Sequence, residues 1–434
     1  MSEKMPDFSK EREFHKGRWE KKAQQESERG PFKRFVDKNG PDRDADDFMR
    51  EEASRDDKDF EKRRNPEQKE LLHAEYKEWL KSLQPVIEGF MERVRHPEDT
   101  ENTTMIIMMG GGMRGPYTAG QGISLQMMGI TPDVVDMVIG TSTGAVVATA
   151  FVAGLEEMLK STTMMIEELS SKNFIDAARV LKQEVIKLRL ISDLWSQGEY
   201  KIDTDKVVGS HPDLLYTVTE PVRGDEEPKV KYLDAKSISP GPIAGVISSM
   251  SIPYITGDIP AVNGVKNYDG GFGRMNIKND IEEFKKRHNG KPPKNILILP
   301  TMPFEYFEEM IPTADEIKFA KFARRRAGSL MRAGSLDGAA SLHQVEKGLL
   351  LKHEQRKAFE LIQKETGVHI GVLWPPNSGL TTTSIDGDDM KEAVLSSARD
   401  TIKQFGGKQP DEIPEYVSEK KRLKEAIADF KKAV

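Results

Sequence analysis

The chain has 434 residues, of which 37% are hydrophobic and 31% charged, and its formal net charge is −6. This length predicts one large domain or two smaller ones, the acidic balance argues against bulk nucleic-acid binding, and the absence of cysteine excludes disulfides, thiol catalysis and zinc–thiolate sites. No signal peptide and no run of about 18 apolar residues is found, so we expect a cytoplasmic protein without a membrane-spanning helix.

Residues 1–66 form a charged N-terminal extension, in which 18 residues are Lys or Arg and 18 are Asp or Glu. Such a segment buries too little apolar surface to offset the entropy that is lost on ordering. We therefore predict that it is disordered. The sequence leaves open an alternative, a docking arm that uses Trp19, Phe32 and Phe35.

Two helical segments flank the central part of the chain. Residues 67–104 are predicted to be a helical lead-in, because apolar residues recur with a helical period between Glu67 and Arg95. Pro85 interrupts this period, which predicts a kink or two separate helices. Residues 408–434 are predicted to form a charged helical tail.

Residues 105–407 alternate short apolar runs with helical stretches, which predicts an α/β domain with a mostly parallel sheet flanked by helices. The predicted strands are Met105–Met109, Val134–Ile139, Leu214–Val218, Val230–Leu233, Val262–Tyr268, Asn295–Leu299 and His369–Leu373. The predicted helices are Pro116–Met128, Gly144–Leu155, Thr163–Ser170, Phe174–Lys187, Pro242–Met250, Asp280–Arg287, Asp315–Met331, Leu342–Glu365 and Met390–Phe405.

A glycine-rich loop follows the first predicted strand and precedes Pro116, a favoured first residue of a helix. Free backbone N–H groups at a helix start bind anions, so the loop fits either a phosphate or the oxygen of a reacting ester. The loop also matches the dinucleotide pattern G-x-G-x-x-G, which is a weak signal when taken alone. Its residues are Gly110, Gly111, Gly112, Met113, Arg114 and Gly115.

The second predicted strand ends in GTSTG, the G-x-S-x-G pattern of a nucleophilic serine on a sharp strand-to-helix turn. A dinucleotide site would instead need an acidic residue at this strand end, whereas Asp133 and Asp136 lie at its start. Ser142 is therefore the candidate nucleophile. The residues of this turn are Gly140, Thr141, Ser142, Thr143 and Gly144.

A serine nucleophile needs a base to take its proton. Asp269 is the best candidate, because it ends the predicted strand Val262–Tyr268 and precedes Gly270 and Gly271. The glycine loop, Ser142 and Asp269 each follow the carboxyl end of a predicted strand, and in a parallel sheet these ends face one crevice. Such a grouping suits acyl transfer. The histidines after the serine, none of which has a setting typical of catalysis, are His211, His288, His343, His353 and His369.

GGGMRG, GTSTG and DGG, in this order, resemble the motifs of the patatin-like phospholipases, serine lipid acyl hydrolases that use a Ser–Asp dyad without histidine. The resemblance covers roughly Met105–Gly407 and implies a three-layer patatin-like fold. The glycine loop that runs into Tyr-Thr-Ala-Gly is similar to that of a bacterial subgroup. Ala145 replaces a frequent glycine, and the first 66 residues have no counterpart.

The resemblance implies a role for each motif. Ser142 would attack the carbonyl of a lipid or other acyl ester, and Asp269 would accept its proton and later activate water. Backbone N–H groups of Gly111, Gly112 and Met113 would hold the oxyanion, and Arg114 would steady the loop or a substrate phosphate. This chemistry implies neither a cofactor nor a metal, and partial burial of Asp269 would make it more basic.

The segment Ile317–Gly334 is basic and has no acidic residue. It includes Arg324, Arg325 and Arg326. As an amphipathic helix it would lie on an anionic membrane surface and make the protein peripheral. The alternative is a packed helix whose arginines pair with acidic residues of the chain.

Two functions of other classes stay open. The first is a nucleotide-binding protein that uses the loop Gly110–Gly115. The second is a non-catalytic scaffold that acts through the N-terminal arm, although a scaffold gives no reason to keep both Ser142 and Asp269. The sequence gives no indication of the oligomeric state.

Overall fold

The computed structural model of the chain describes residues 66–406, except 177–178, 180–183, 221–228, 254, 273–275, 305–344, 377–379 and 381–384. The charged extension, the segment Ile317–Gly334 with its three arginines, and the C-terminal tail therefore lie outside the described residues. What the sequence predicts for them, and for the domain boundaries, stays a prediction. The described residues all belong to a unit that spans Asn65–Val434.

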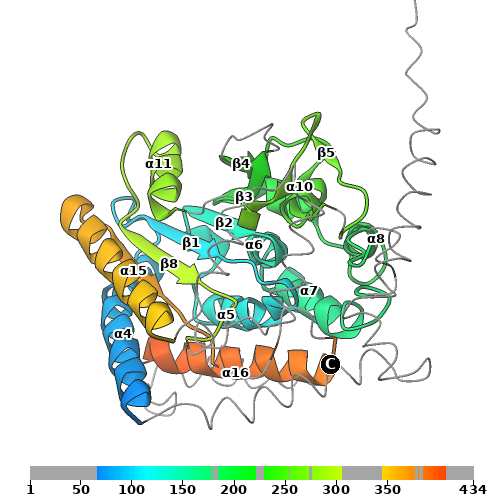
Figure 1. Cartoon of the computed structure of the whole chain (residues 1–434). Coiled ribbons are helices and arrows are strands. Elements are labelled where there is room, and N and C mark those ends of the chain that lie inside the picture. The colour runs from blue at the N-terminus through cyan, green and yellow to red at the C-terminus, as the bar shows by residue number, and fades with distance from the viewer. Residues whose placement is uncertain are drawn as a thin grey trace, which may run out of the picture. The chain divides into compact units, whose positions relative to one another are not determined.

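A mostly parallel sheet runs through this unit, with the strand order β4-β3-β2-β1-β8-β9 (Figure 1). Only β4 and the short β7 run antiparallel to their neighbour β3 in this sheet. Helices flank the sheet, which confirms the predicted α/β fold class and is consistent with a patatin-like fold. The strands of this sheet are β1 (Thr104–Met108), β2 (Met137–Thr141), β3 (Asp213–Glu220), β4 (Lys229–Asp234), β7 (Tyr268–Asp269), β8 (Asn295–Leu299) and β9 (His369–Val372).

The two faces of the sheet bury separate apolar clusters, because successive side chains of a strand point to opposite sides. In β1, Ile106 and Met108 belong to the cluster that α5, α6, α7 and α16 complete, whereas Met105 and Ile107 belong to the cluster with α11 and α15. The helices are α4 (Pro66–Arg95), α5 (Gly115–Met127), α6 (Thr143–Ala153), α7 (Leu155–Glu167), α8 (Arg189–Ser196), α9 (Thr204–Gly209), α10 (Pro242–Ser249), α11 (Ile277–Arg287), α15 (Val345–Thr366) and α16 (Gly387–Gly406).

Helix α4 runs through Pro85 as one element, so the alternative of two separate helices is wrong. The helix packs against β9 and β8. Leu83 and Val86, on either side of the proline, are buried. This packing offsets the loss of the hydrogen bond that proline removes from a helix interior.

The predicted strand Val262–Tyr268 is wrong as a single element. The chain instead forms a small hairpin of β5 (Ala261–Val262) and β6 (Val265–Lys266), and β7 follows it. Asn263 and Gly264 make the turn, with φ angles of 51° and 79°. Asn-Gly is the favoured pair for a two-residue hairpin turn, because both central residues need positive φ.

The predicted helix Phe174–Lys187 is wrong as well. Ile175 and Ile186 form an antiparallel bridge, and the Asp176 N–H donates to the Val185 carbonyl at 2.9 Å. The chain therefore folds back on itself at this point. The next helix, α8, was not predicted.

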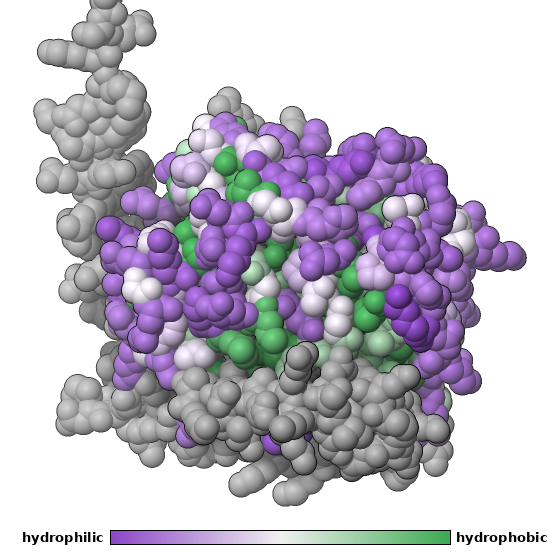
Figure 2. Space-filling model, turned by 180° about the vertical axis from the view of Figure 1, so that it is seen from behind, coloured by the Kyte–Doolittle hydropathy of each residue, from purple (hydrophilic) through white to green (hydrophobic). Residues whose placement is uncertain are grey.

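The described residues on the face drawn in Figure 2 are largely hydrophilic. Figure 2 shows one face on which apolar side chains gather between hydrophilic ones. Among the described residues, no helix combines the length and the apolar character needed to cross a bilayer.

Candidate active site

Ser142 stands at the junction between β2 and α6, where its backbone adopts φ 53° and ψ −127°. Positive φ is strained for a residue with a Cβ, and such strain collects at functional sites. The serine N–H is held by the Ser249 hydroxyl at 2.9 Å. A sharp, tethered turn of this kind is typical of a nucleophilic serine, as the sequence pattern predicts.

The glycine loop lies directly against this serine. A Cβ added to Gly110 would come 2.5 Å from the Ser142 Cβ, so only glycine allows this approach. Gly112 has a φ of 59°, and the segment Gly112–Arg114 is a turn of 3-10 helix that leads into α5. Arg114 is buried, and its Nε donates to the Leu380 carbonyl at 3.2 Å. This contact favours the loop-holding role of the arginine.

Asp269 reaches the same end of the sheet by a different route from the one that the sequence predicted. It does not end a long parallel strand, because β7 has two residues and pairs with β3 in antiparallel, with Asp269 opposite Val218. The Asp269 N–H donates to the Ser251 carbonyl and its own carbonyl accepts from the Thr219 hydroxyl, each at 2.8 Å. The carboxylate is thus anchored through its backbone on both sides.

The Asp269 carboxyl is buried, with 6% of the residue exposed. Burial raises its pKa to about 6, against hydrogen bonds from the Ser142 hydroxyl and the Gly271 N–H that lower it. The Gly271 N–H donates to Oδ1 at 2.7 Å. The carboxyl is therefore ionised at neutral pH but more basic than an ordinary aspartate, as a general base needs to be.

Ser249 joins the two halves of the site, and no sequence motif indicates it. Its hydroxyl accepts from the Ser142 N–H and donates to the Thr217 carbonyl of β3 at 2.7 Å. Two residues later, Ser251 accepts from Asp269. One short segment at the end of α10 thus holds both candidate catalytic residues, and the only sequence signal was its run of small hydroxyl side chains.

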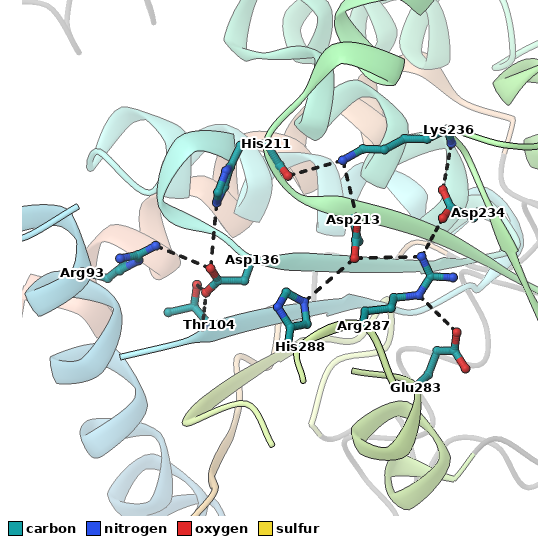
Figure 3. Close-up of polar contacts among 10 residues, drawn as sticks. All are labelled: Arg93, Thr104, Asp136, His211, Asp213, Asp234, Lys236, Glu283, Arg287 and His288. Carbon is teal, nitrogen blue, oxygen red and sulfur yellow. Dashed lines mark hydrogen bonds and ion pairs between the residues drawn. The ribbon is translucent and has the colours of Figure 1, made fainter. Parts of the chain in front are cut away.

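His211 and His288 lie at the other end of the sheet (Figure 3). His211 Nε2 is 3.9 Å from Asp136 Oδ1, and His288 Nε2 is 3.9 Å from Asp213 Oδ2. Asp136 precedes β2 and Asp213 begins β3. Ser142 follows the carboxyl end of β2, so neither histidine is placed to act as its base.

Asp136 has a structural role at the end of the sheet opposite Ser142. Its Oδ2 accepts from the Thr104 N–H at 2.7 Å, and its Oδ1 lies 3.5 Å from Nη2 of the buried Arg93 (Figure 3). It therefore ties the starts of β1 and β2 to α4. The acidic residue that a dinucleotide ribose would need does not follow β2, where Ser142 stands instead.

Within the ranges that the structure describes, no group of three or more His, Asp or Glu side chains is arranged to hold a metal ion.

No family model matches the chain, and no curated protein matches it. Among solved structures, it is similar to the crystal structure of VipD from Legionella pneumophila, with a TM-score of 0.33 and 11% sequence identity. The match covers 70% of this chain and 67% of that chain. A likeness this distant says nothing about the site, whose chemistry rests on its own residues.

Proposed function

We propose that the chain is a serine hydrolase that cleaves acyl esters of lipids through Ser142 and Asp269. The observation that carries the proposal is the pairing of a serine held at positive φ with a buried carboxyl whose pKa is raised to about 6. A nucleophile and a base in hydrogen-bonding reach of each other are the minimum for acyl transfer. The resemblance of the three motifs to the patatin-like phospholipases supports the choice of a lipid substrate.

The reaction has two halves. Ser142 Oγ attacks the ester carbonyl while Asp269 takes the hydroxyl proton, and the oxygen of the tetrahedral intermediate faces the N–H groups of the glycine loop. The C–O bond to the leaving alcohol then breaks, and Asp269 returns the proton to that alcohol. A water molecule, deprotonated by Asp269, attacks the acyl-serine; the bond between the acyl carbon and Ser142 Oγ breaks, Asp269 returns the proton to Oγ, and the fatty acid is released.

Hydrolysis and labelling together test this proposal. The purified chain is expected to release p-nitrophenol from a short-chain p-nitrophenyl ester and fatty acid from labelled phospholipid. A fluorophosphonate should label one serine, because Ser142 Oγ displaces its fluoride and forms an O–P bond. Ser142→Ala should abolish labelling, whereas Ser170→Ala should leave it intact, because Ser170 is a partly buried serine whose hydroxyl donates to the Ile166 carbonyl. A parent chain that is neither active nor labelled would overturn the proposal.

The activity is expected to follow the ionisation of Asp269. Because the base must be unprotonated, kcat/KM should rise about tenfold per pH unit below pH 6 and level off above pH 7. The measurement is kcat/KM for a small ester between pH 4.5 and 8.5. A matched variant, His211→Gln, should leave the rise of kcat/KM at the same pH, because His211 lies at the other end of the sheet. If kcat/KM levels off already near pH 4, or if the pH of its rise shifts in His211→Gln, Asp269 is not the group whose ionisation controls the activity.

Contact with an anionic membrane surface through Arg324–Arg326 belongs to the same proposal and lies outside the described residues. Binding of nucleotide has no further support beyond the glycine pattern.

A further inference from the structure

Two threonine hydroxyls hold the carbonyl groups of the glycine loop. Thr143 Oγ1 donates to the Gly112 carbonyl, and Thr301 Oγ1 donates to the Gly110 carbonyl, each at 2.7 Å. Thr143 begins α6, whereas Thr301 follows β8, which pairs with β1 on the side away from β2. The loop is therefore held from both sides by elements that are far apart in the chain.

Holding a carbonyl also orients the next N–H group, because the peptide unit is planar and trans, with its C=O and N–H pointing in opposite directions. Thr301 thus sets the direction of the Gly111 N–H through Gly110. Thr143 sets that of the Met113 N–H through Gly112, together with the Gly115 N–H, which donates to the same Gly112 carbonyl. Within the described part of the chain, neither of these N–H groups donates to a protein acceptor. Both stay available for a substrate oxygen.

The fit between the loop and Thr301 is close. A Cβ added to Gly111 would come 2.0 Å from Thr301 Oγ1, so glycine at this position lets the threonine reach the loop. Thr301 is 1% exposed, and its short side chain has little freedom to move away. The hydroxyl is therefore in a fixed place relative to the loop backbone.

We propose that Thr301 and Thr143 are positioning residues that aim the Gly111 and Met113 N–H groups at the oxyanion. The inference rests on the proposed function. Donors stabilise a transition state most when they are oriented before the charge develops. Without the Thr301 hydroxyl the Gly110 carbonyl would turn more freely, and the Gly111 N–H coupled to it would turn as well. Without the Thr143 hydroxyl the Gly112 carbonyl would keep one hydrogen bond, from the Gly115 N–H, and would turn less. Neither threonine needs to touch the substrate.

The test replaces each hydroxyl by a methyl group of similar size. Thr301→Val and Thr143→Val are expected to lower kcat for a p-nitrophenyl ester by about 10- to 100-fold with little change in KM. The affinity for a trifluoromethyl ketone, which forms a tetrahedral oxyanion adduct with serine, should fall in parallel with kcat. Thr301→Ser keeps a hydroxyl and should restore most of both. Thr162→Val is the matched control, because Thr162 is buried and its hydroxyl donates only within its own helix, to the Met158 carbonyl.

The outcomes separate this inference from the proposed function. An active parent chain whose valine variants keep full kcat and full ketone affinity would overturn the positioning role and leave the dyad standing. Equal losses in Thr301→Val and Thr301→Ser would also overturn it, since packing and not the hydroxyl would then be responsible. A parent chain that neither cleaves the ester nor binds the ketone would overturn the proposed function, and this inference with it.

Discussion

An Asp269→Asn variant is expected to lose a factor between about 10⁴ and 10⁶ in kcat/KM, and Ser142→Ala a similar factor. Asparagine has nearly the size of aspartate and still accepts from the Gly271 N–H, but it cannot take the proton of the serine hydroxyl. Residues that act as one unit have costs that do not add, so the double variant should be no slower than the slower single one. The measurement is kcat/KM of all three variants on one ester. Additive losses would contradict a dyad.

The stability of Asp269→Asn is the control for its loss of activity. Because the pKa of Asp269 is about 6 in the folded chain and near 3.8 in the unfolded chain, the folded state holds the proton more tightly. The contribution of Asp269 to the free energy of unfolding therefore falls as the pH rises from about 4 to 6, and it stays at the lower value above this range. Asn carries no charge, so at pH 7.5 the free energy of unfolding of Asp269→Asn, measured in urea, should exceed that of the parent by up to about 3 kcal/mol. Near pH 4 the free energies of the two should be equal. A variant that is less stable at both pH values would have lost activity through damage to the fold.

The turns that carry Ser142 and Asp269 could be predicted because their signals are local, whereas the catalytic roles of the two residues stay a prediction. An apolar strand, two glycines and a serine within a few positions are enough to indicate the turn at Ser142, and the Asp-Gly-Gly turn marks Asp269. The path of Asp269 to the site could not be predicted in the same way. It depends on the pairing of β7 with β3, and the two strands are about 50 residues apart in the sequence.

The residues that support the site were missed for a related reason. Ser249 and Thr301 are hydroxyl side chains of a kind found throughout a chain, and only their tertiary neighbours give them a role. Thr301 could nevertheless have been predicted from the sequence. It follows the carboxyl end of a correctly predicted strand, Asn295–Leu299, and the rule that predicts Ser142 at this edge of the sheet applies equally to it.

The two segments where the predicted elements were wrong differ in cause. The hairpin at Asn263–Gly264 carried a clear turn signal, which the prediction of one continuous strand ignored. The segment from Phe174 to Lys187 carried no comparable signal. Its bridge joins Ile175 to Ile186, so its shape depends on a contact between the ends of the segment and not on a local preference.

A Gly144→Ala variant is expected to lose about 3 to 5 kcal/mol of unfolding free energy. A Cβ at this position would lie 2.1 Å from the Met108 carbonyl oxygen and 2.7 Å from that of Met109. Both atoms belong to the backbone at the end of β1, so they cannot move aside as the tip of a side chain would. The first turn of α6 would have to move away from the sheet, and Ser142, which directly precedes this helix, would move with it. The variant should therefore also lose activity.

Gly209→Ala is the matched control for this variant. Gly209 ends α9, and no atom outside its immediate neighbourhood lies within 4 Å of the Cβ position. Alanine there should be neutral or raise the unfolding free energy by up to about 1 kcal/mol, because it restricts the unfolded chain. Urea midpoints compared at equal m-values measure both effects. Equal stability of the two variants would show that α6 and β1 do not approach this closely. A loss confined to Gly144→Ala would mean that this glycine of the G-x-S-x-G pattern makes room for the backbone at the end of β1.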